Sequence, residues 1–353
     1  MSQPADLTAA ERHPCAGRVS VVIVNWNGRR YLEACLRSLT EPAKTAELLE
    51  LIVVDNGSTD GSAEYLKSRP DVRLLPQETN LGYAEANNVG IAAATGDFVL
   101  LLNNDTIAGP GFLGPLVAAM EDPAVGAAQS LLLTFDEPRR IDSYGSYVTW
   151  TGFLYHHRYD QPEEVDERSR APFDIFAAKG AALLLRRRLL ERIGAFDAGF
   201  FAYLEDSDLC WRVWLAGSRV VCVPGSVVLH RGGGTAGTLA SEFVFFHSFK
   251  NRLAMLLKNL SGPRLAAILP VNVTLNLAAA GTYLVRGRLG PARGILRGLG
   301  WNAAHLGETL AKRRRVQGSI RQVSDRALWP VIARRPRLSY YYRLLTGLRG
   351  YRE

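Results

Sequence analysis

Three carboxylates lie within four positions, at Glu205, Asp206 and Asp208. Repulsion between such close negative charges can raise the pKa of one of them toward the range that is useful for a general base. The same residues begin a predicted helix, and acidic residues in a first helical turn are also favoured by the helix dipole alone. Asp208 and Arg212 are four residues apart, so a plain ion pair along the helix is a further alternative.

Other polar side chains follow short apolar runs at 19–25, 50–55 and 98–102. These runs are rich in β-branched and aliphatic residues, which is typical of strands buried on both faces. Between the first two runs, Tyr31 to Leu39 show helical spacing, so 19–55 is predicted to form a βαβ unit with a parallel sheet. Ligands of such a sheet bind beyond the carboxyl ends of its strands, where Asp55 and Asn103–Asp105 stand.

The rest of the first 240 residues is less regular. It predicts a helix ending near Leu66, a short strand at 72–75 and a helix through Ala94. From 125 to 173 aromatic residues are interleaved with polar ones, which predicts a long functional loop or a small extra sheet. A further helix is expected at 183–193.

Several motifs follow one another in a fixed order: Val21-Val-Ile-Val-Asn-Trp-Asn27, Val53-Val-Asp-Asn-Gly-Ser-Thr-Asp60, Asn80-Leu-Gly-Tyr83, Leu101-Leu-Asn-Asn-Asp105, Glu205-Asp-x-Asp-Leu-x-x-Arg212 and His230. Together they resemble the family 2 glycosyltransferases over roughly residues 19–235. The resemblance implies the GT-A fold, a Rossmann-like α/β fold whose mixed, mostly parallel sheet is flanked by helices. It also implies an inverting, metal-dependent transfer of a sugar from a nucleotide diphosphate donor.

The resemblance places the donor nucleotide against Asp55, whose carboxylate can accept the imide N–H of uracil or thymine. Capping of the next helix is the structural alternative for Asp55, although Ser58 and Asp60 are better placed as caps. Asn25 is expected to line the nucleoside pocket or to be an ordinary turn residue. The predicted nucleotide- and donor-binding residues are Asn25, Asn27, Asp55, Ser58, Asn80, Gly82, Tyr83, Asn87, Asn104 and Gly180.

Asn103-Asn104-Asp105 occupies the place of the family's Asp-x-Asp motif, whose oxygen ligands hold Mg²⁺ or Mn²⁺ against the donor diphosphate. Asn103 replaces a carboxylate with a neutral oxygen, so metal binding by the protein alone should be weak. His230 resembles the distal histidine that completes this metal site, with a purely structural histidine as the alternative. Lys179 is expected to be solvated and not to contact phosphate.

The family's catalytic aspartate maps onto Asp206, which would deprotonate the acceptor hydroxyl as it attacks the anomeric carbon. Glu205 is the second catalytic candidate, and Asp208 and Trp211 are the candidate acceptor-binding residues. Gly180 allows the close approach of its backbone to the donor sugar.

Charge divides the chain of 353 residues unevenly: residues 240–353 carry 20 Lys and Arg against 4 Asp and Glu. We expect a flexible N-terminus at 1–18, a catalytic domain at 19–239 and a basic helical region at 240–353. Residues 240–258 form an aromatic amphipathic helix suited to a membrane interface or to packing on the core. The 21 uncharged residues at 265–285 are long enough to span a bilayer, but Pro270 and several polar residues favour monotopic embedding.

These features predict a cytoplasmic protein held peripherally or monotopically on the inner face of the cell membrane. The Asn-Asn-Asp triplet with Trp26 and Lys179-Gly180 resembles bacterial rhamnosyltransferases that use dTDP-rhamnose, and UDP-hexoses are the alternative donors. The expected acceptor is a cell-surface glycan or a lipid-linked saccharide. A nucleotidyltransferase is disfavoured because 25–30 lacks a GxxxxGK loop. No nucleic-acid-binding motif accompanies the basic tail, so a nucleic-acid partner is not expected.

Overall fold

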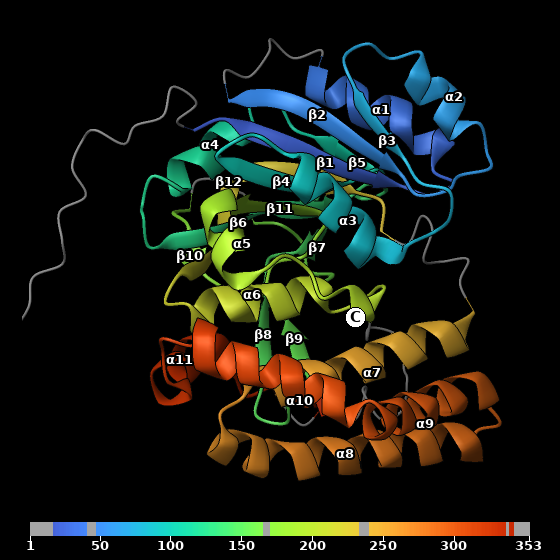
Figure 1. The fold of residues 1–353 in the computed structure, drawn as a ribbon, viewed down its shortest axis with the longest axis vertical. Coiled ribbons are helices and arrows are strands. Elements are labelled where there is room, and N and C mark those ends of the chain that lie inside the picture. The colour runs from blue at the N-terminus through green and yellow to red at the C-terminus, as the bar shows by residue number, and fades with distance from the viewer. Residues whose placement is uncertain (1–16, 41–46, 165–169, 233–239, 337–338, 342–353) are drawn as a thin grey trace, which may run out of the picture.

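The computed structural model describes residues 17–40, 47–164, 170–232, 240–336 and 339–341. The predicted flexible N-terminus at 1–18 lies almost entirely outside the described residues. The fold is an α/β sheet with helices on both faces and a helical C-terminal region packed beside it (Figure 1).

The central sheet is mixed and mostly parallel, as predicted. Its strand order is β10-β12-β6-β11-β4-β1-β2-β3, with β5 paired to β12 and β7 paired to β6. Strands β3, β2, β1 and β4 are parallel, and β11 runs antiparallel to β4 and β6. The bounds are β1 (Val19–Asn25), β2 (Leu48–Asp55), β3 (Arg73–Pro76), β4 (Phe98–Asn103), β5 (Thr106–Ala108), β6 (Val125–Thr134), β7 (Ile141–Ser143), β10 (Phe173–Asp174), β11 (Ala182–Arg186) and β12 (Arg219–His230).

Alternate residues of β1 enter the apolar cores on opposite faces of the sheet, as Val21 and Val22 illustrate. One core receives the buried sides of α1 (Arg29–Thr40), α2 (Ser62–Lys67) and α4 (Leu113–Ala119). The other receives α3 (Gly82–Ala93), α5 (Arg187–Ile193) and α6 (Glu205–Leu215). The continuous apolarity of β1 therefore has the expected cause, because both of its faces are covered.

Two of the predicted elements are wrong. The segment 125–134 is a ten-residue strand, β6, although its Gly126-Ala-Ala-Gln-Ser130 stretch has little β propensity. Pairing with β11 and β12 on its two sides determines this conformation. The predicted helix at 183–193 begins as strand β11 because Leu183–Leu185 pair with both β4 and β6, and the helix forms only from Arg187. Tertiary pairing overrides the helix preference of leucine here.

The predicted small extra sheet is present, and it joins the middle of the chain to its C-terminal part. It consists of β8 (Ser146–Thr149), β9 (Leu154–His156) and β13 (Ala333–Arg334). Strand β13 pairs in parallel with β8, and the Tyr340 hydroxyl donates to the Leu154 carbonyl. The C-terminal region is therefore tied to the segment between β6 and β11.

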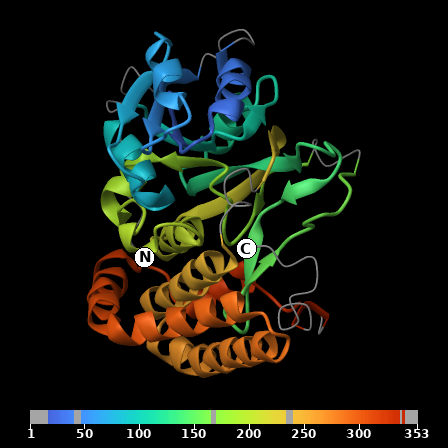
Figure 2. The same cartoon turned by 90° about the vertical axis from the view of Figure 1, so that its right-hand side faces the viewer.

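The C-terminal helices lie against α6 on the side away from the sheet (Figures 1 and 2). They are α7 (Ser241–Asn259), α8 (Gly262–Val285), α9 (Leu289–Ala304), α10 (Leu306–Arg315) and α11 (Asp325–Ile332), with a π-helical turn at Val316–Ile320. Phe249, Leu253 and Leu256 of α7 are buried. This part of the helix therefore packs on the core, as one of the two alternatives predicted, whereas Phe243 and Phe246 nearer its start are only partly buried.

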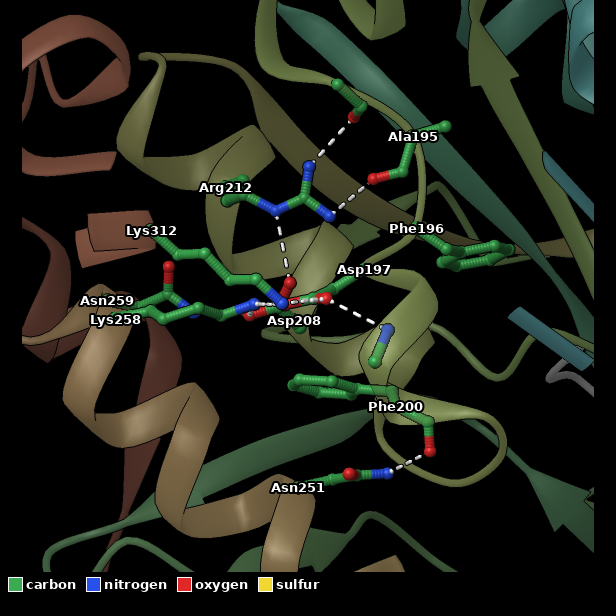
Figure 3. A network of polar contacts seen from close by, with 12 residues as sticks. Ala195, Phe196, Asp197, Phe200, Asp208, Arg212, Asn251, Lys258, Asn259 and Lys312 are labelled. Carbon is green, nitrogen blue, oxygen red and sulfur yellow. Dashed lines mark hydrogen bonds and ion pairs between the residues drawn. The ribbon is translucent and has the colours of Figure 1, made fainter. Parts of the chain in front are cut away.

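An ionic network joins α7 to α6 and joins both α7 and α10 to Asp197, which precedes α6 in the chain (Figure 3). Lys258 of α7 lies 2.7 Å from Asp197 and 3.0 Å from Asp208, measured between nitrogen and oxygen. Lys312 of α10 also pairs with Asp197. Burial raises the pKa of Asp197, but the two ammonium groups outweigh that effect and hold its pKa below the usual value. The carboxylates of this network depend on cations from the C-terminal helices.

Lys258→Ala should lower the free energy of unfolding by about 1–3 kcal/mol, because it removes one of the two cations that pair with Asp197 and one of the two that pair with the completely buried Asp208. Arg297→Ala is the control, since Arg297 forms an exposed ion pair with Glu242 and should cost no more than about 1 kcal/mol. Urea denaturation measures both values. Equal losses in the two variants would contradict the importance of this network.

Candidate active site

Side-chain hydrogen bonds link three predicted donor-binding residues across adjacent strand ends. Asn25 ends β1 and is in register with Asp55 at the end of β2. The Asn104 amide donates to Asn25 Oδ1 at 2.7 Å, and Asn25 Nδ2 donates to Asp55 Oδ1 at 3.0 Å. All three side chains are buried. The parallel strands thus bring these polar groups to one edge of the sheet, as predicted.

The loops after β1 and β2 are joined by the side chains of Asn27 and Ser58. Ser58 Oγ accepts hydrogen bonds from the Asn27 backbone N–H and from Asn25 Nδ2. Asn27 Oδ1 accepts from the Thr59 N–H at 2.8 Å. The cap position of α2 is Gly61, and of the candidate caps it is Asp60, not Asp55 or Ser58, whose side chain accepts from the first N–H of the helix, at Ser62. The structural role of Asp55 and Ser58 is to shape the two loops at the sheet edge.

A second group of predicted donor-binding residues surrounds the start of α3. Asn80 Oδ1 accepts from Asn56 Nδ2 and from the Gly82 N–H. Gly82 has φ of 81°, and a Cβ there would lie 2.5 Å from the Phe201 ring, so only glycine fits. The Tyr83 hydroxyl donates to the Gly180 carbonyl at 3.0 Å. Asn87 is buried, and its amide donates to the carbonyl of Tyr83, one turn earlier in α3.

The three predicted metal ligands face one another. Asn103 ends β4 and His230 ends β12. Strand β5 begins directly after Asp105 and pairs with β12, which brings His230 beside Asp105. His230 Nε2 lies 3.3 Å from Asp105 Oδ1 and 3.4 Å from Asn103 Nδ2. Asn103 Oδ1 is buried without a hydrogen-bond partner. Such an orphaned oxygen beside a carboxylate and an imidazole fits a divalent cation. In the described part of the chain, no three His, Cys, Asp or Glu residues cluster closely enough to hold a metal ion.

Asp142 is a site residue that the sequence does not reveal. Its carboxylate lies 2.8 Å from His230 Nδ1 and 2.7 Å from Lys179 Nζ. With Nδ1 paired to Asp142, Nε2 is the ring nitrogen of His230 that faces Asp105 and Asn103. Burial raises the pKa of Asp142, but Lys179 and His230 outweigh it and lower that pKa overall. Lys179 is therefore paired with Asp142, whereas the sequence predicted a solvated side chain.

The two candidate catalytic carboxyls have different surroundings. Asp206 is half-buried and accepts hydrogen bonds from the Gly180 N–H at 2.9 Å and from the Ser207 N–H at 2.6 Å. Glu205 is buried, and its Oε2 has no partner. Burial raises the pKa of both carboxyls, and the charge of Asp206 raises that of Glu205 further, well above its usual value. We infer that Asp206 is the ionised member of the pair and that Glu205 is the protonated one.

The structure places neither predicted acceptor-binding residue at an accessible surface. Asp208 is completely buried, where Arg212 Nε lies 3.1 Å from its carboxylate and Lys258 and Asn259 bind it from α7. Trp211 is also completely buried and packs edge-to-face on Phe176. Both side chains project from α6 into the core, because the helix is covered on two sides, by the sheet and by α7. Neither is retained as an acceptor contact, and the ion-pair alternative for Asp208 is correct.

Comparison with known proteins shows the family of this chain. Residues 20–194 match Glycosyl transferase family 2. An N-acetylglucosaminyl-diphospho-decaprenol L-rhamnosyltransferase of Mycobacterium tuberculosis is 31% identical over 238 residues, covering 62% of this chain and 77% of that protein. The O-antigen biosynthesis protein RfbC of Myxococcus xanthus is 28% identical over 242 residues, covering 65% of this chain and 19% of that protein.

Solved structures share the fold. GalNAc-T7, crystallised with UDP, GalNAc and Mn²⁺, superposes with a TM-score of 0.56 at 18% identity, covering 82% of this chain and 57% of that one. TarS of S. aureus (residues 1–349, in complex with UDP-GlcNAc) gives a TM-score of 0.52 at 16% identity, covering 93% and 88%. The chain belongs to glycosyl transferase family 2 and has the GT-A fold. It is a nucleotide-sugar-dependent, inverting hexosyltransferase.

Glu205→Gln should stabilise the protein more at pH 8 than at pH 4. Because the folded-state pKa of Glu205 is raised, its contribution to stability is fully present below the unfolded value of about 4.3 and is lost as pH rises through the folded pKa. The neutral amide avoids that loss. Thermal unfolding from pH 4 to pH 8 measures the difference in Tm, with the exposed Glu121→Gln variant as control. If the difference in Tm between Glu205→Gln and the unaltered protein is the same from pH 4 to pH 8, Glu205 is not the protonated carboxyl.

Proposed function

Because the chain belongs to glycosyl transferase family 2, we propose that it transfers L-rhamnose from dTDP-rhamnose to a lipid-linked saccharide or a growing cell-surface glycan. The observation that carries this proposal is that Asp55, Asn25 and Asn104 are hydrogen-bonded at the sheet edge next to the Asp105–His230 pair, while Gly180 binds both Asp206 and Tyr83. The donor sugar is supported by the Mycobacterium relative, whose name specifies L-rhamnosyl transfer. UDP-hexose is the alternative, because uracil and thymine offer the same imide N–H to Asp55.

Nucleotide recognition rests on Asp55. Its two oxygens already accept from Asn25 Nδ2 and from the Ser58 N–H, and these bonds fix the plane of the carboxylate. Each carboxylate oxygen can accept a second hydrogen bond, which leaves capacity for the imide N–H of the base. A cytosine ring presents an unprotonated N3 at the same place, so an ionised Asp55 disfavours it.

The cation site comprises Asn103, Asp105 and His230, with Mg²⁺ or Mn²⁺ as the expected ion. When bound, the ion would neutralise charge on the departing nucleoside diphosphate. Asp105 is the one carboxylate of the strand-end triplet, and Asn103 contributes a neutral oxygen. The diphosphate must therefore supply much of the negative charge that holds the ion.

Asp206 is the proposed general base. Its carboxylate accepts the proton of the acceptor hydroxyl while that oxygen forms a bond to the anomeric carbon. The bond from this carbon to the diphosphate breaks on the opposite side, so a single displacement inverts the configuration. The Gly180 and Ser207 N–H groups hold the carboxylate in place, and protonated Glu205 adds no second negative charge beside it.

We also propose that residues 240–353 bind the cytoplasmic face of the membrane, beside a catalytic domain at 19–239. Within the described residues, only α8 is long and apolar enough to cross a bilayer, and 28% of its most apolar stretch is buried. Its polar Asn272 and Asn276 are completely buried, whereas Leu277 and Leu284 are 49% and 46% exposed. This arrangement, polar inward and apolar outward, is the reverse of a helix in water and suits lipid.

The position of α8 favours monotopic embedding. It forms the edge of the molecule farthest from the sheet (Figure 1), its C-terminal half shares a buried apolar cluster with α9, and Asn272 donates to the Thr151 carbonyl. A helix held in this way lies along the protein surface. The exposed Arg288 and Arg293 stand just beyond its end, where they suit anionic headgroups.

The donor assignment predicts that dTDP-rhamnose is hydrolysed fastest in a panel of dTDP-, UDP- and GDP-sugars. Hydrolysis should stop in EDTA and resume with Mn²⁺, and Asp105→Ala should lose the response to Mn²⁺. A preference for a UDP-hexose would replace the rhamnose assignment with the alternative. Full turnover in EDTA would contradict the cation site.

Asp206→Asn should lower kcat by on the order of 10²- to 10⁴-fold, because loss of a general base has that effect. The dissociation constant of the nucleotide should change little. Glu205→Gln, one residue away, is the matched control and should keep most of the activity. The reverse pattern, with Glu205→Gln inactive and Asp206→Asn active, would move the base to Glu205.

The membrane surface is tested by sedimentation of the full chain with vesicles that contain anionic lipid. Leu277→Glu combined with Leu284→Glu should weaken binding by on the order of 100-fold, because burial of each Leu contributes about 1.5–3 kcal/mol. Lys67→Glu on α2 changes the net charge equally and should have little effect. High salt should also weaken binding. Unchanged binding of the double variant would exclude α8 as the docking surface.

A further inference from the structure

The loop before α6 has a backbone that ordinary residues rarely adopt. Phe201, Tyr203 and Leu204 all have positive φ, at 64°, 72° and 67°. At Phe201, ψ is −63° and the Ala202 N–H donates to the Phe200 carbonyl at 2.8 Å, which together define a classic γ-turn. Each such residue costs on the order of 1–3 kcal/mol and persists only where its surroundings impose the conformation. The strained loop ends immediately before Glu205 and Asp206.

One side chain of α7 binds this loop at several points. Asn251 Nδ2 lies 3.0 Å from the carbonyl oxygen of Phe200, 2.8 Å from that of Ala202 and 2.7 Å from that of Tyr203. A primary amide has two protons, so at least one of them is shared between two carbonyls. Asn251 is completely buried (Figure 3 shows it facing Phe200), and water cannot replace these bonds.

Neighbouring residues on the same face of α7 extend this contact. The Lys250 ammonium donates to the Gly199 carbonyl at 2.7 Å, and His247 Nδ1 lies 3.1 Å from the Phe200 carbonyl. The Phe201 ring packs against His247 at a centroid distance of 5.3 Å. The loop at 199–204 is therefore held from the C-terminal region at nearly every residue.

The other side of the loop meets the donor-binding segment. The Phe201 carbonyl accepts from the Ala84 N–H at 3.0 Å, and the Phe201 ring occupies the space that a side chain at Gly82 would fill. A change in the loop would therefore move the start of α6, which carries Asp206, relative to Gly180 and Tyr83. Displacing a reacting group by about 1 Å can cost on the order of 100-fold in rate.

We propose that Asn251 is a positioning residue for Asp206, acting by holding the loop at 199–204 in its strained conformation. This inference rests on the proposed role of Asp206 as the general base. It assigns the C-terminal region a part in the transfer reaction itself, in addition to membrane binding. Asn251 does not contact the site directly.

Asn251→Ala should lower kcat by on the order of 10- to 100-fold and leave the dissociation constant of the nucleotide unchanged. Asn302→Ala is the matched control. Asn302 is a buried amide on α9 that donates to the carbonyls of Lys250 and Gly298, both at 2.9 Å, without touching the loop. Both variants lose buried hydrogen bonds of α7, but only Asn251→Ala should lose activity. Hydrogen exchange at the amides of 199–204 should accelerate only in Asn251→Ala.

A double variant separates this inference from the base assignment. If Asn251 acts through Asp206, adding Asn251→Ala to Asp206→Asn should reduce kcat by less than twofold further, since residues that act as a unit are not additive. Independent, multiplicative losses would overturn the inference, as would equal kcat losses in the Asn251 and Asn302 variants. If Asn251→Ala keeps its kcat while Asp206→Asn is inactive, the inference about Asn251 is wrong and the base assignment stands. Full activity of Asp206→Asn would overturn the base assignment, and this inference with it.

Discussion

The constraint on which the active site depends is the crowding of three carboxyl groups in the first turn of α6, where Glu205 and Asp208 are buried and Asp206 is half-buried. Each group is accommodated in a different way. Asp208 is neutralised by Arg212 and Lys258, Asp206 is bound by two backbone N–H groups, and Glu205, whose Oε2 has no partner, takes up a proton. A low-dielectric interior does not tolerate three unpaired negative charges. The result is a single accessible carboxylate, Asp206, beside a neutral neighbour.

The dipeptide Lys179-Gly180 connects the parts of the site. The Gly180 N–H binds Asp206, its carbonyl accepts from Tyr83 of α3, and the Lys179 ammonium pairs with Asp142, which orients His230. The base, the donor-binding helix and the cation ligands are therefore all linked to one dipeptide, which lies just before β11. The strained loop before α6 is hydrogen-bonded to α7, and this contact links the C-terminal helices to the active site.

The sequence predicts the parallel half of the fold well, because β1, β2 and β4 are continuous apolar runs with polar residues at their carboxyl ends. Asn25, Asp55 and Asn103 end these strands, Asp105 follows two residues after β4, and Asp206 lies in the first turn of α6. It fails for β6 and β11, whose conformation comes from pairing with distant strands. Asp142 gives no signal, because it is a single aspartate in an irregular segment. Asp208 and Trp211 were misjudged because helical periodicity alone did not reveal that α7 covers α6.

The most direct test of the central claim is the titration of the carboxyl carbons of Glu205 and Asp206 by ¹³C NMR, with Glu205→Gln and Asp206→Asn used to assign the signals. We expect Asp206 to ionise first and Glu205 to stay protonated at neutral pH, with a pKa well above its usual value. In Asp206→Asn, the pKa of Glu205 should fall, because the neighbouring charge is gone. Ionisation of Glu205 at a lower pH than Asp206 would contradict the assignment of Asp206 as the base.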